Sequence, residues 1–237
     1  MESTRNAVTA GLHPVRVWDW PTRLFHWALA LCVTGAVVSA KIGGNAMAWH
    51  FRFGLAVLAL LVFRLVWGVI GGHWSRFTSF LYAPTTLLRY ARGLAHPQER
   101  LDVGHSPTGA LSVFALLGLL AVQVATGLVA DDEIASTGPL IRFVESATSL
   151  AATSWHKSWG QWLLLGLVAL HLCAIAVYRV VHRHDLVTPM LVGDKHLPPA
   201  VAAQVPASAD HAGRWVLALA ALSLGVAAAL WVQAQGG

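Results

Sequence analysis

Charged side chains are scarce in this sequence of 237 residues. They make up 11% of the chain, whereas 56% of its residues are hydrophobic. A soluble domain carries about a quarter charged residues, so the composition excludes an ordinary water-soluble protein. Cysteine is nearly absent too, because only Cys32 and Cys173 occur and both lie in apolar stretches. Two such residues exclude a disulfide framework.

The sequence contains long apolar runs in place of charged residues. A membrane-spanning helix needs about 20 mostly apolar residues. Five stretches approach or reach that length: Leu24–Ala40, Trp49–Ile70, Ala110–Ala130, Trp159–Val181 and Trp215–Val232. They are rich in Leu, Val and Ala and do not alternate as barrel strands do. The sequence therefore predicts an all-α membrane protein.

The positions of lysine and arginine predict the orientation of these helices. Eleven of them flank one side of the predicted membrane: Arg5, Arg16, Arg23, Arg76, Arg89, Arg92, Arg100, Arg179, Arg183, Lys195 and Arg214. Three flank the other: Lys41, Arg142 and Lys157. Positive residues gather on the cytoplasmic side. We therefore expect a multi-pass protein of a bacterial inner membrane, with its amino terminus cytoplasmic and its carboxyl terminus periplasmic.

The chain divides into three expected parts. Residues 1–184 are expected to form a four-helix transmembrane bundle. Residues 185–213 contain four prolines and are interpreted as an extended cytoplasmic linker. Residues 214–237 would form a fifth, less integral C-terminal transmembrane helix. Short helices are expected at residues 84–93 and 140–150. Residues 1–23 lack the apolar core of a signal peptide, so the first helix is expected to be an uncleaved anchor.

Four histidines lie inside or at the ends of the apolar stretches, where an ionisable side chain is costly. In the predicted topology, His50 and His156 share the outer level of the membrane. His26 and His171 share the inner level. Residues 156 and 171 are about 22 Å apart along a helix, and their directions differ by only about 60°.

A single histidine in such a segment is more often a hydrogen-bonded packing residue than a ligand. The pairing of the four histidines at two depths favours ligands instead, because all four positions agree with a topology that was derived independently of them. A zinc site needs its ligands within one small sphere, so ligands at two depths argue against one zinc ion. Two trans imidazoles at each level match bis-histidine haem ligation. No Cys-x-x-Cys-His motif is present, so the two haems would be non-covalent b haems.

Three arginines are candidate partners of haem propionates, through the fork that a guanidinium offers to a carboxylate. Arg23 and Arg64 are expected at the inner level and Arg52 at the outer level. The alternative is that each side chain extends to the lipid headgroups. The other histidines are expected at the surface: His13, His73, His96, His105, His182, His184, His196 and His211.

Several motifs resemble those of the bacterial cytochrome b561 family, which includes the cytochrome b subunits of nickel–iron hydrogenases. The similarity covers about residues 15–185. Its motifs are Val17-Trp-Asp-Trp-Pro-Thr-Arg-Leu-Phe-His-Trp27, Trp49-His-Phe-Arg-Phe-Gly54, Phe63-Arg-Leu-Val-Trp-Gly68, Gly104-His-Ser-Pro-Thr-Gly109, Thr126-Gly-Leu128 and Trp155-His-Lys-Ser-Trp-Gly160. The resemblance implies a four-helix core with two b haems that moves electrons across the membrane.

The resemblance further implies exchange of electrons between the quinone pool and a periplasmic redox protein. An acidic outer loop, with Asp131, Asp132, Glu133 and Glu145, would suit a basic c-type cytochrome. Three alternatives stay open at this point. The chain could be a superoxide:quinone oxidoreductase, which needs a positively charged outer funnel. It could anchor a periplasmic hydrogenase, or it could be a transporter or scaffold without haem.

Overall fold

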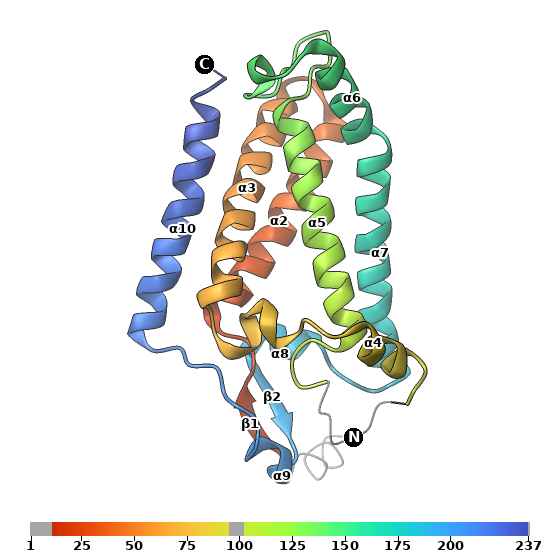
Figure 1. The fold of residues 1–237 in the computed structure, drawn as a ribbon, viewed down its shortest axis with the longest axis vertical. Coiled ribbons are helices and arrows are strands. Elements are labelled where there is room, and N and C mark those ends of the chain that lie inside the picture. Colours follow the sequence, from red (N-terminus) through yellow and green to blue (C-terminus); the bar gives the residue numbers. More distant parts are fainter. Residues whose placement is uncertain (1–10, 95–101, 237) are drawn as a thin grey trace.

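Five long helices run along one axis in the computed structural model, which describes residues 11–94 and 102–236 (Figure 1). Within these residues, five helical segments are long and apolar enough to cross a membrane: Trp20–Ile42, Gly44–Ile70, Pro107–Leu128, Ser146–Val180 and Ala212–Gln233. The prediction of an all-α membrane bundle with a fifth C-terminal helix is thereby confirmed. Arg5, His96 and Arg100 lie outside the described residues.

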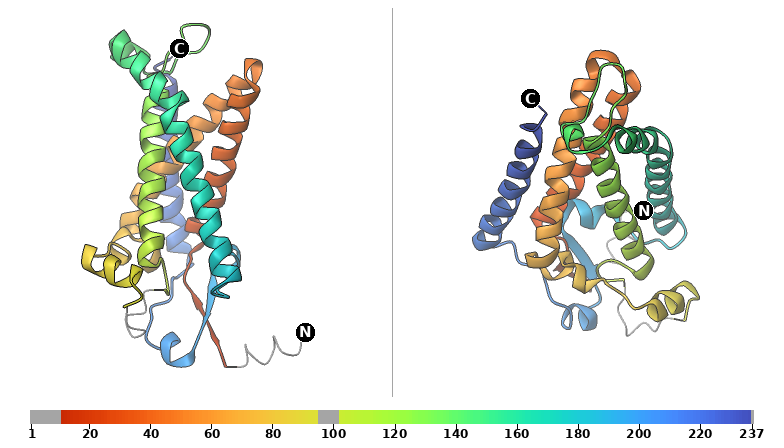
Figure 2. Two further views of the ribbon diagram at one scale, coloured as in Figure 1. Left: turned by 90° about the vertical axis from the view of Figure 1, so that its right-hand side faces the viewer. Right: turned by 45° about the horizontal axis from the view of Figure 1, so that its top comes forward.

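The two ends of the bundle differ in structure (Figures 1 and 2). At one end, which we call the sheet end, strands β1 (His13–Arg16) and β2 (Asp194–Leu197) pair antiparallel. The short helices α4 (Pro84–Ala91), α8 (Val187–Val192) and α9 (Pro199–Ala202) lie there too. At the other end, the loop end, are the 3-10 turn η1 (Gly44–Ala46), the segment 129–145 with η5 (Ile141–Phe143), and helix α6 (Ser146–Lys157).

Helix α2 (Trp20–Ile42) begins at Asp19, whose carboxylate accepts a 2.9 Å hydrogen bond from the backbone N–H of Thr22. Pro21 in the first turn suits this start. The helix ends at Gly43, whose φ of +70° favours glycine. Because η1 is so short, helix α3 (Met47–Ile70) returns antiparallel against α2.

Helix α5 (Pro107–Leu128) packs against α3 and against α7 (Trp159–Val180). Side chains of these three helices form an apolar cluster in the middle of the bundle, joined by residues of α2: Val57, Leu61, Leu120, Leu164, Leu29 and Cys32. By residue count, this cluster lies midway between the two histidine levels. Two further 3-10 turns, η2 (His73–Ser75) and η3 (Phe77–Ser79), connect α3 to α4.

Helices α6 and α7 are two helices, separated at Ser158, whose backbone angles of φ −112° and ψ −98° are not helical. His156 therefore lies on α6 and His171 on α7. The angular offset expected between them assumed one continuous helix, and that assumption is wrong. The short helix expected at 84–93 is confirmed as α4, whereas the one expected at 140–150 is represented by η5 and the first turns of α6.

The segment 185–213 is folded rather than extended, so the expectation of an extended linker is wrong. Strand β2 pairs with β1, and Arg16 forms ion pairs with Asp194 and Asp210. Val15, Val17 and Leu197 are buried in a small core there, together with Trp18 and Val103. This small sheet could not be predicted from the sequence, because neither strand exceeds four residues and their pairing joins distant parts of the chain.

Helix α10 (Ala212–Gln233) packs along α3 and is an integral part of the bundle, contrary to the less integral helix that we expected. The contact is close: a Cβ atom at Gly225 would lie 2.3 Å from the carbonyl oxygen of Ala59. Ala218, Ala221 and Ala229 are buried on the same helix. Small residues allow membrane helices to approach in this way.

Candidate cofactor site

The imidazoles of His50 and His156 face each other at the loop end. Their ring centres are 5.9 Å apart and their planes are nearly perpendicular, at 86°. A metal–imidazole bond is about 2 Å long, so two rings on opposite sides of one metal ion have their centres about 6 Å apart. Helices α3 and α6 thus bring together the pair expected at the outer level, at a separation that fits one iron between them.

Each of these rings is held by a backbone carbonyl of a neighbouring helix. Nδ1 of His50 lies 2.9 Å from the carbonyl oxygen of Ala36 in α2. Nδ1 of His156 lies 2.8 Å from the carbonyl oxygen of Gln123 in α5. Because a carbonyl oxygen only accepts, Nδ1 must carry the hydrogen, which leaves Nε2 as the free ligand atom. This orientation by a second hydrogen bond is typical of metal-ligating histidines.

Gln123 is a site residue that the sequence analysis did not single out. Its side-chain amide donates a 2.8 Å hydrogen bond to the backbone carbonyl of His156, so Gln123 and His156 are bonded in both directions. A glutamine inside an apolar segment was the available signal, because buried polar side chains need partners.

Two glycines leave room beside these rings. A Cβ atom at Gly127 would lie 2.8 Å from Cε1 of His156, so the ring occupies the place that a side chain would take. Gly54 lies one helical turn after His50, and a Cβ atom there would meet no atom within 4 Å. Both glycines line a cavity of about 950 Å³ that contains His50 and His156. This is the size range of cofactor pockets.

Cationic side chains line the same cavity. Lys41, Arg52 and Lys157 belong to its lining, and Asp132 is the one carboxylate among those residues. Arg52 is exposed, and its guanidinium carbon lies 4.8 Å from the ring centre of Trp49. The predicted outer arginine therefore borders the cavity of the histidine pair, and no carboxylate among the described residues pairs with it.

His26 of α2 and His171 of α7 form a looser pair near the sheet end. Both are partly buried, and they are close enough for their charges to interact. Within residues 11–94 and 102–236, no ring contact of the kind seen for His50 and His156 joins them. Nδ1 of His26 is buried without a hydrogen-bond partner. A buried ring nitrogen without a partner costs free energy, which a bond to iron would offset.

Arg23 and Arg64 lie near this pair, but each already bonds backbone carbonyls. Arg23 donates to the carbonyl oxygens of Leu191 and Val192, the latter at 2.9 Å, and lies over the Trp20 ring. Arg64 is buried and donates to the carbonyl oxygen of Ser75 at 2.9 Å. A guanidinium has five N–H donors, so donors remain, and a bond to a propionate stays a prediction for both residues.

His105 is not the surface residue that we expected. Its ring packs between Trp18 and Phe80, with ring centres 4.6 and 4.3 Å away, and its Nδ1 is buried without a partner. Burial, together with the charges of Arg64 and His26, lowers the pKa of His105 to about 3. Of the other histidines, His13, His182, His184, His196 and His211 are exposed and His73 is partly buried.

Asp19 is a second residue of the sheet end whose role the sequence did not reveal. Its carboxylate is 1% exposed and accepts four hydrogen bonds. The donors are the backbone N–H groups of Thr22 and Gly72, the indole N–H of Trp67 and the hydroxyl of Ser75, at 2.8–3.3 Å. Asp19 thereby joins the start of α2 to the end of α3, one helical turn before Arg23 and about two turns before His26.

These residues fit b-type haem. The four histidines form two pairs. The rings of His50 and His156 are oriented and spaced for a single iron, and both residues line a cavity of cofactor size. In the part of the chain that the structure describes, no three His, Cys, Asp or Glu side chains form a group suited to hold a metal ion by themselves. A multi-pass helical bundle with such ligands defines the class of membrane cytochromes b.

Comparison with known proteins identifies the family. Residues 17–193 match the family described as prokaryotic cytochrome b561, and the chain belongs to it. The chain is a membrane cytochrome b that transfers electrons, and its cofactor is b-type haem.

Curated relatives are similar over most of their length. The probable Ni/Fe-hydrogenase B-type cytochrome subunit of Bradyrhizobium diazoefficiens is 22% identical over 78% of this chain and 87% of the relative. The probable Ni/Fe-hydrogenase 1 B-type cytochrome subunit of Escherichia coli is 24% identical, over 65% and 79%. A probable Ni/Fe-hydrogenase B-type cytochrome subunit of Cupriavidus necator is 25% identical, over 75% and 85%. No solved structure matches the chain.

Proposed function

We propose that this protein carries electrons across the membrane between the quinone pool and a redox protein at the loop end. Two b haems would be held by His50 with His156 and by His26 with His171. The observation that supports this most directly is the approach of the His50 and His156 rings to 5.9 Å at one level. His171 lies at a different level, about 18 Å along the axis of α7 from its first residue, Trp159.

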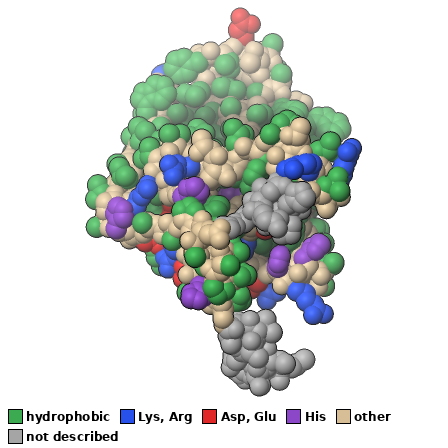
Figure 3. All heavy atoms as spheres, turned by 60° about the horizontal axis from the view of Figure 1, so that its bottom comes forward, with side chains coloured by type: hydrophobic (Ala, Val, Ile, Leu, Met, Phe, Trp, Pro, Cys, Tyr) green, Lys and Arg blue, Asp and Glu red, His purple; other side chains and the backbone are tan. Residues whose placement is uncertain are grey.

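The orientation that we propose places the sheet end in the cytoplasm. Lysine, arginine and histidine side chains gather on that end of the molecule (Figure 3), as the excess of positive residues on cytoplasmic faces predicts. The loop end, with Gly236, would then face the periplasm. The odd number of crossings agrees with the positions of the two ends of the described chain (Figure 1).

The chain's own residues prepare the sites for electron transfer. Bound haem supplies the one-electron chemistry, and the protein sets ligation, polarity and access. The carbonyls of Ala36 and Gln123 hold Nε2 of His50 and His156 free to ligate, and the apolar cluster around Leu61 keeps water out between the two levels. Arg52 and Lys41 would offset propionate charge at the outer level.

Histidine variants with optical spectra test the ligand assignment. Wild type should contain two haems per chain with b-type reduced-minus-oxidised bands. His156→Ala and His171→Ala should each lose one haem, whereas the matched control His13→Ala, at an exposed position of β1, should keep both. A His171→Ala protein that keeps two six-coordinate, reducible haems would contradict the proposal.

The partner proposed first is a nickel–iron hydrogenase, because the curated relatives carry that assignment in their names. A c-type cytochrome is the second candidate, favoured by the acidic residues of the loop 131–145. Mild purification from the native membrane, followed by mass spectrometry and metal analysis, separates them. Recovery of nickel with the cytochrome supports the first partner, recovery of a c-type cytochrome supports the second, and recovery of neither overturns both.

Superoxide oxidation is a second candidate function, favoured by one observation. Lys41, Arg52 and Lys157 line the cavity of the outer pair, so an anion would be attracted to it. In that reaction superoxide would give one electron to ferric haem held by His50 and His156 and would leave as dioxygen. Superoxide generated by pulse radiolysis should reduce the wild-type protein quickly and the Lys41→Gln/Arg52→Gln/Lys157→Gln protein slowly. Equal rates in both proteins would reject this candidate.

A further inference from the structure

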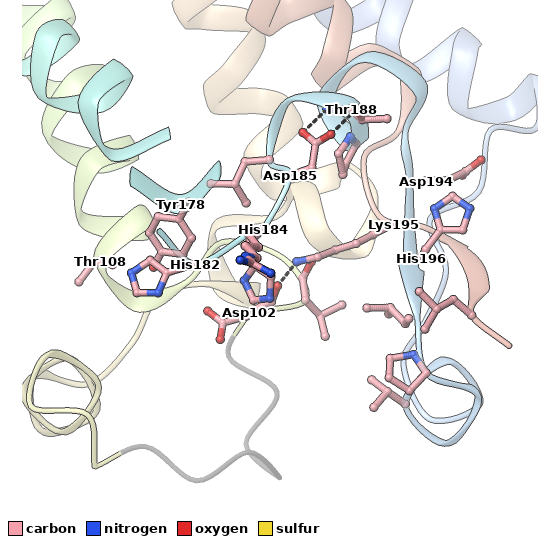
Figure 4. Close-up of a pocket in the computed structure, with 18 of the residues that line it drawn as sticks. Asp102, Thr108, Tyr178, His182, His184, Asp185, Thr188, Asp194, Lys195 and His196 are labelled. Atoms are coloured by element: carbon pink, nitrogen blue, oxygen red, sulfur yellow. Dashed lines mark hydrogen bonds between the residues drawn. The ribbon is translucent and has the colours of Figure 1, made fainter. Parts of the chain in front are cut away.

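A second cavity, of about 1150 Å³, lies at the sheet end between α4, the carboxyl end of α7 and the segment around β2 (Figure 4). Apolar side chains form part of its lining: Leu12, Val103, Leu186, Leu197 and Val201. None of the four proposed haem ligands belongs to this lining. The cavity is therefore distinct from the haem sites described above.

A chain of hydrogen bonds crosses one side of this cavity. The hydroxyl of Tyr90 donates to Oδ1 of Asp102 at 2.6 Å. The hydroxyls of Tyr90 and Tyr178 lie 3.2 Å apart. Because the single hydrogen of Tyr90 goes to Asp102, Tyr178 must donate to Tyr90. The chain thus leads from Tyr178 through Tyr90 to a carboxylate. Burial, and then the bond to Asp102, raise the pKa of Tyr90, so its phenol stays protonated.

This cluster lies within reach of the inner histidine level. Tyr178 follows His171 by seven residues on α7, which is nearly two full turns. The two side chains therefore share a face of the helix and lie about 10 Å apart along its axis. A molecule bound at Tyr178 would be a short electron-transfer step from the His26–His171 pair.

The cavity also borders the expected membrane surface. Helix α4 contributes Tyr90 and Ala91 to the lining, and Leu81, Leu88 and Leu94 on and beside α4 are exposed. A short amphipathic helix with exposed leucines suits the lipid interface. A lipid-soluble molecule can thus approach the cavity from the bilayer, while His182, His184, Asp185 and Lys195 line its more polar part (Figure 4).

We propose that this cavity binds the headgroup of the membrane quinol, with Tyr90 and Tyr178 as hydrogen-bond partners and Asp102 as the proton acceptor. This inference rests on the quinone linkage proposed above. Oxidation breaks the two O–H bonds of the quinol. The two electrons would pass, one at a time, to a ferric haem held by His26 and His171, and the two protons would leave through Asp102 to water. Quinone reduction is the same sequence reversed.

Decylubiquinol and the purified holoprotein test the assignment. Asp102→Asn keeps an oxygen that accepts the bond from Tyr90 but removes the proton acceptor. It should slow haem reduction by decylubiquinol about 100-fold, the usual effect of losing a general base. Reduction by dithionite and haem content should not change. Asp102→Glu should restore part of the rate, and Tyr178→Phe should raise KM more than it lowers kcat.

The third tyrosine of the chain provides a matched control. Tyr82 lies outside the cavity lining and donates to the backbone carbonyl of His105 at 2.8 Å. Tyr82→Phe should therefore leave the decylubiquinol rate unchanged. An azido-ubiquinone should label peptides of α4 and of the end of α7, which is a readout independent of turnover.

The outcomes separate the two levels of the proposal. If wild type is reduced by decylubiquinol but Asp102→Asn reacts equally fast, or the label appears only in loop-end peptides, the cavity assignment is wrong and the quinone linkage stands. If decylubiquinol does not reduce the wild-type protein at all, the quinone linkage and the cavity assignment are both wrong.

Discussion

The two histidine pairs of this protein are held in different ways. At the loop end, each ring is fixed by a carbonyl of a neighbouring helix, and the rings lie 5.9 Å apart. At the sheet end, His26 has no hydrogen-bond partner on Nδ1 among the described residues. Order at this end comes instead from the buried side chains of Asp19 and Arg64 and from the enclosed ring of His105. The loop-end pair is organised through the hydrogen bonds of its own rings, and the sheet-end pair through the residues around it.

This comparison predicts different sensitivities. The loop-end site should respond most to changes that touch the rings themselves. The sheet-end site should respond most to changes in the packing that joins α2 to α3. The four predictions below test this difference, from the largest expected effect to the smallest.

Asp19→Ala should be the most damaging change. It leaves the indole of Trp67, the hydroxyl of Ser75 and two backbone N–H groups without their acceptor in a buried place. Each unsatisfied group costs about 1–3 kcal/mol, so we expect a loss of about 3 kcal/mol or more in unfolding free energy. Thermal unfolding in detergent, followed by the haem absorbance, measures it.

The haem content of the Asp19→Ala protein is the decisive part of that experiment. Haem should be lost from the His26–His171 pair first. Loss of haem from the His50–His156 pair first would reverse the comparison. Asp185→Ala, which removes an exposed carboxylate at the same end, serves as the control.

Gly127→Ala should damage the loop-end site selectively. The added methyl group would lie 2.8 Å from Cε1 of His156 and would displace that ring. We expect the affinity for the loop-end haem to fall about tenfold, equivalent to about 1.4 kcal/mol. Gly118→Ala on the same helix meets no atom within 4 Å and is the matched control. Equal haem retention in the two variants would show that the ring position is not critical.

His105 should make the sheet end sensitive to acid. Its pKa is lowered to about 3 in the folded protein, whereas the pKa of a histidine in an unfolded chain is about 6.5. Between these values the unfolded chain binds a proton that the folded protein excludes. Stability should therefore fall as pH decreases below about 6.5, by roughly 1 kcal/mol per pH unit.

The pH dependence is measured as unfolding free energy between pH 7 and 5 in wild type and His105→Phe. The variant should show a flatter profile, while His13→Phe, at an exposed position, should match wild type. A wild-type profile that is flat over this range would contradict burial of a neutral His105.

Gln123→Leu should have the smallest effect. It removes the side-chain bond to the carbonyl of His156 but retains the backbone carbonyl that holds Nδ1. We expect a loss of about 1 kcal/mol in loop-end haem binding, measured by haem transfer to apomyoglobin. A loss larger than that of Gly127→Ala would mean that the glutamine, rather than the space beside the ring, organises the site.

Patterns within single segments were enough to predict much of this architecture. The five spans follow from apolar runs of membrane length. Once their order and the lysine and arginine positions are known, His50 and His156 must lie at one level, and the structure brings these two together. Such inferences need only the direction and length of each helix.

Features that depend on contacts between distant residues could not be predicted. The pairing of β1 with β2 joins residues about 180 positions apart, and the four donors to Asp19 come from three separate segments. The close approach of Gly225 to Ala59 is another contact between distant segments, whereas the break at Ser158 depends on local backbone geometry. His105 was expected at the surface because nothing in its neighbours in sequence shows that Trp18 and Phe80 enclose it.

The separation of the two histidine levels along α6 and α7 has an electrical consequence. Roughly 20 Å of a hydrocarbon layer about 30 Å thick lies between them. If each level holds a haem, as we propose, an electron that passes from one to the other would cross about two thirds of the transmembrane voltage. That amounts to about 1.5 kcal/mol per 100 mV. In an energised cell, with the interior negative, outward electron flow is assisted by this amount and inward flow stores it.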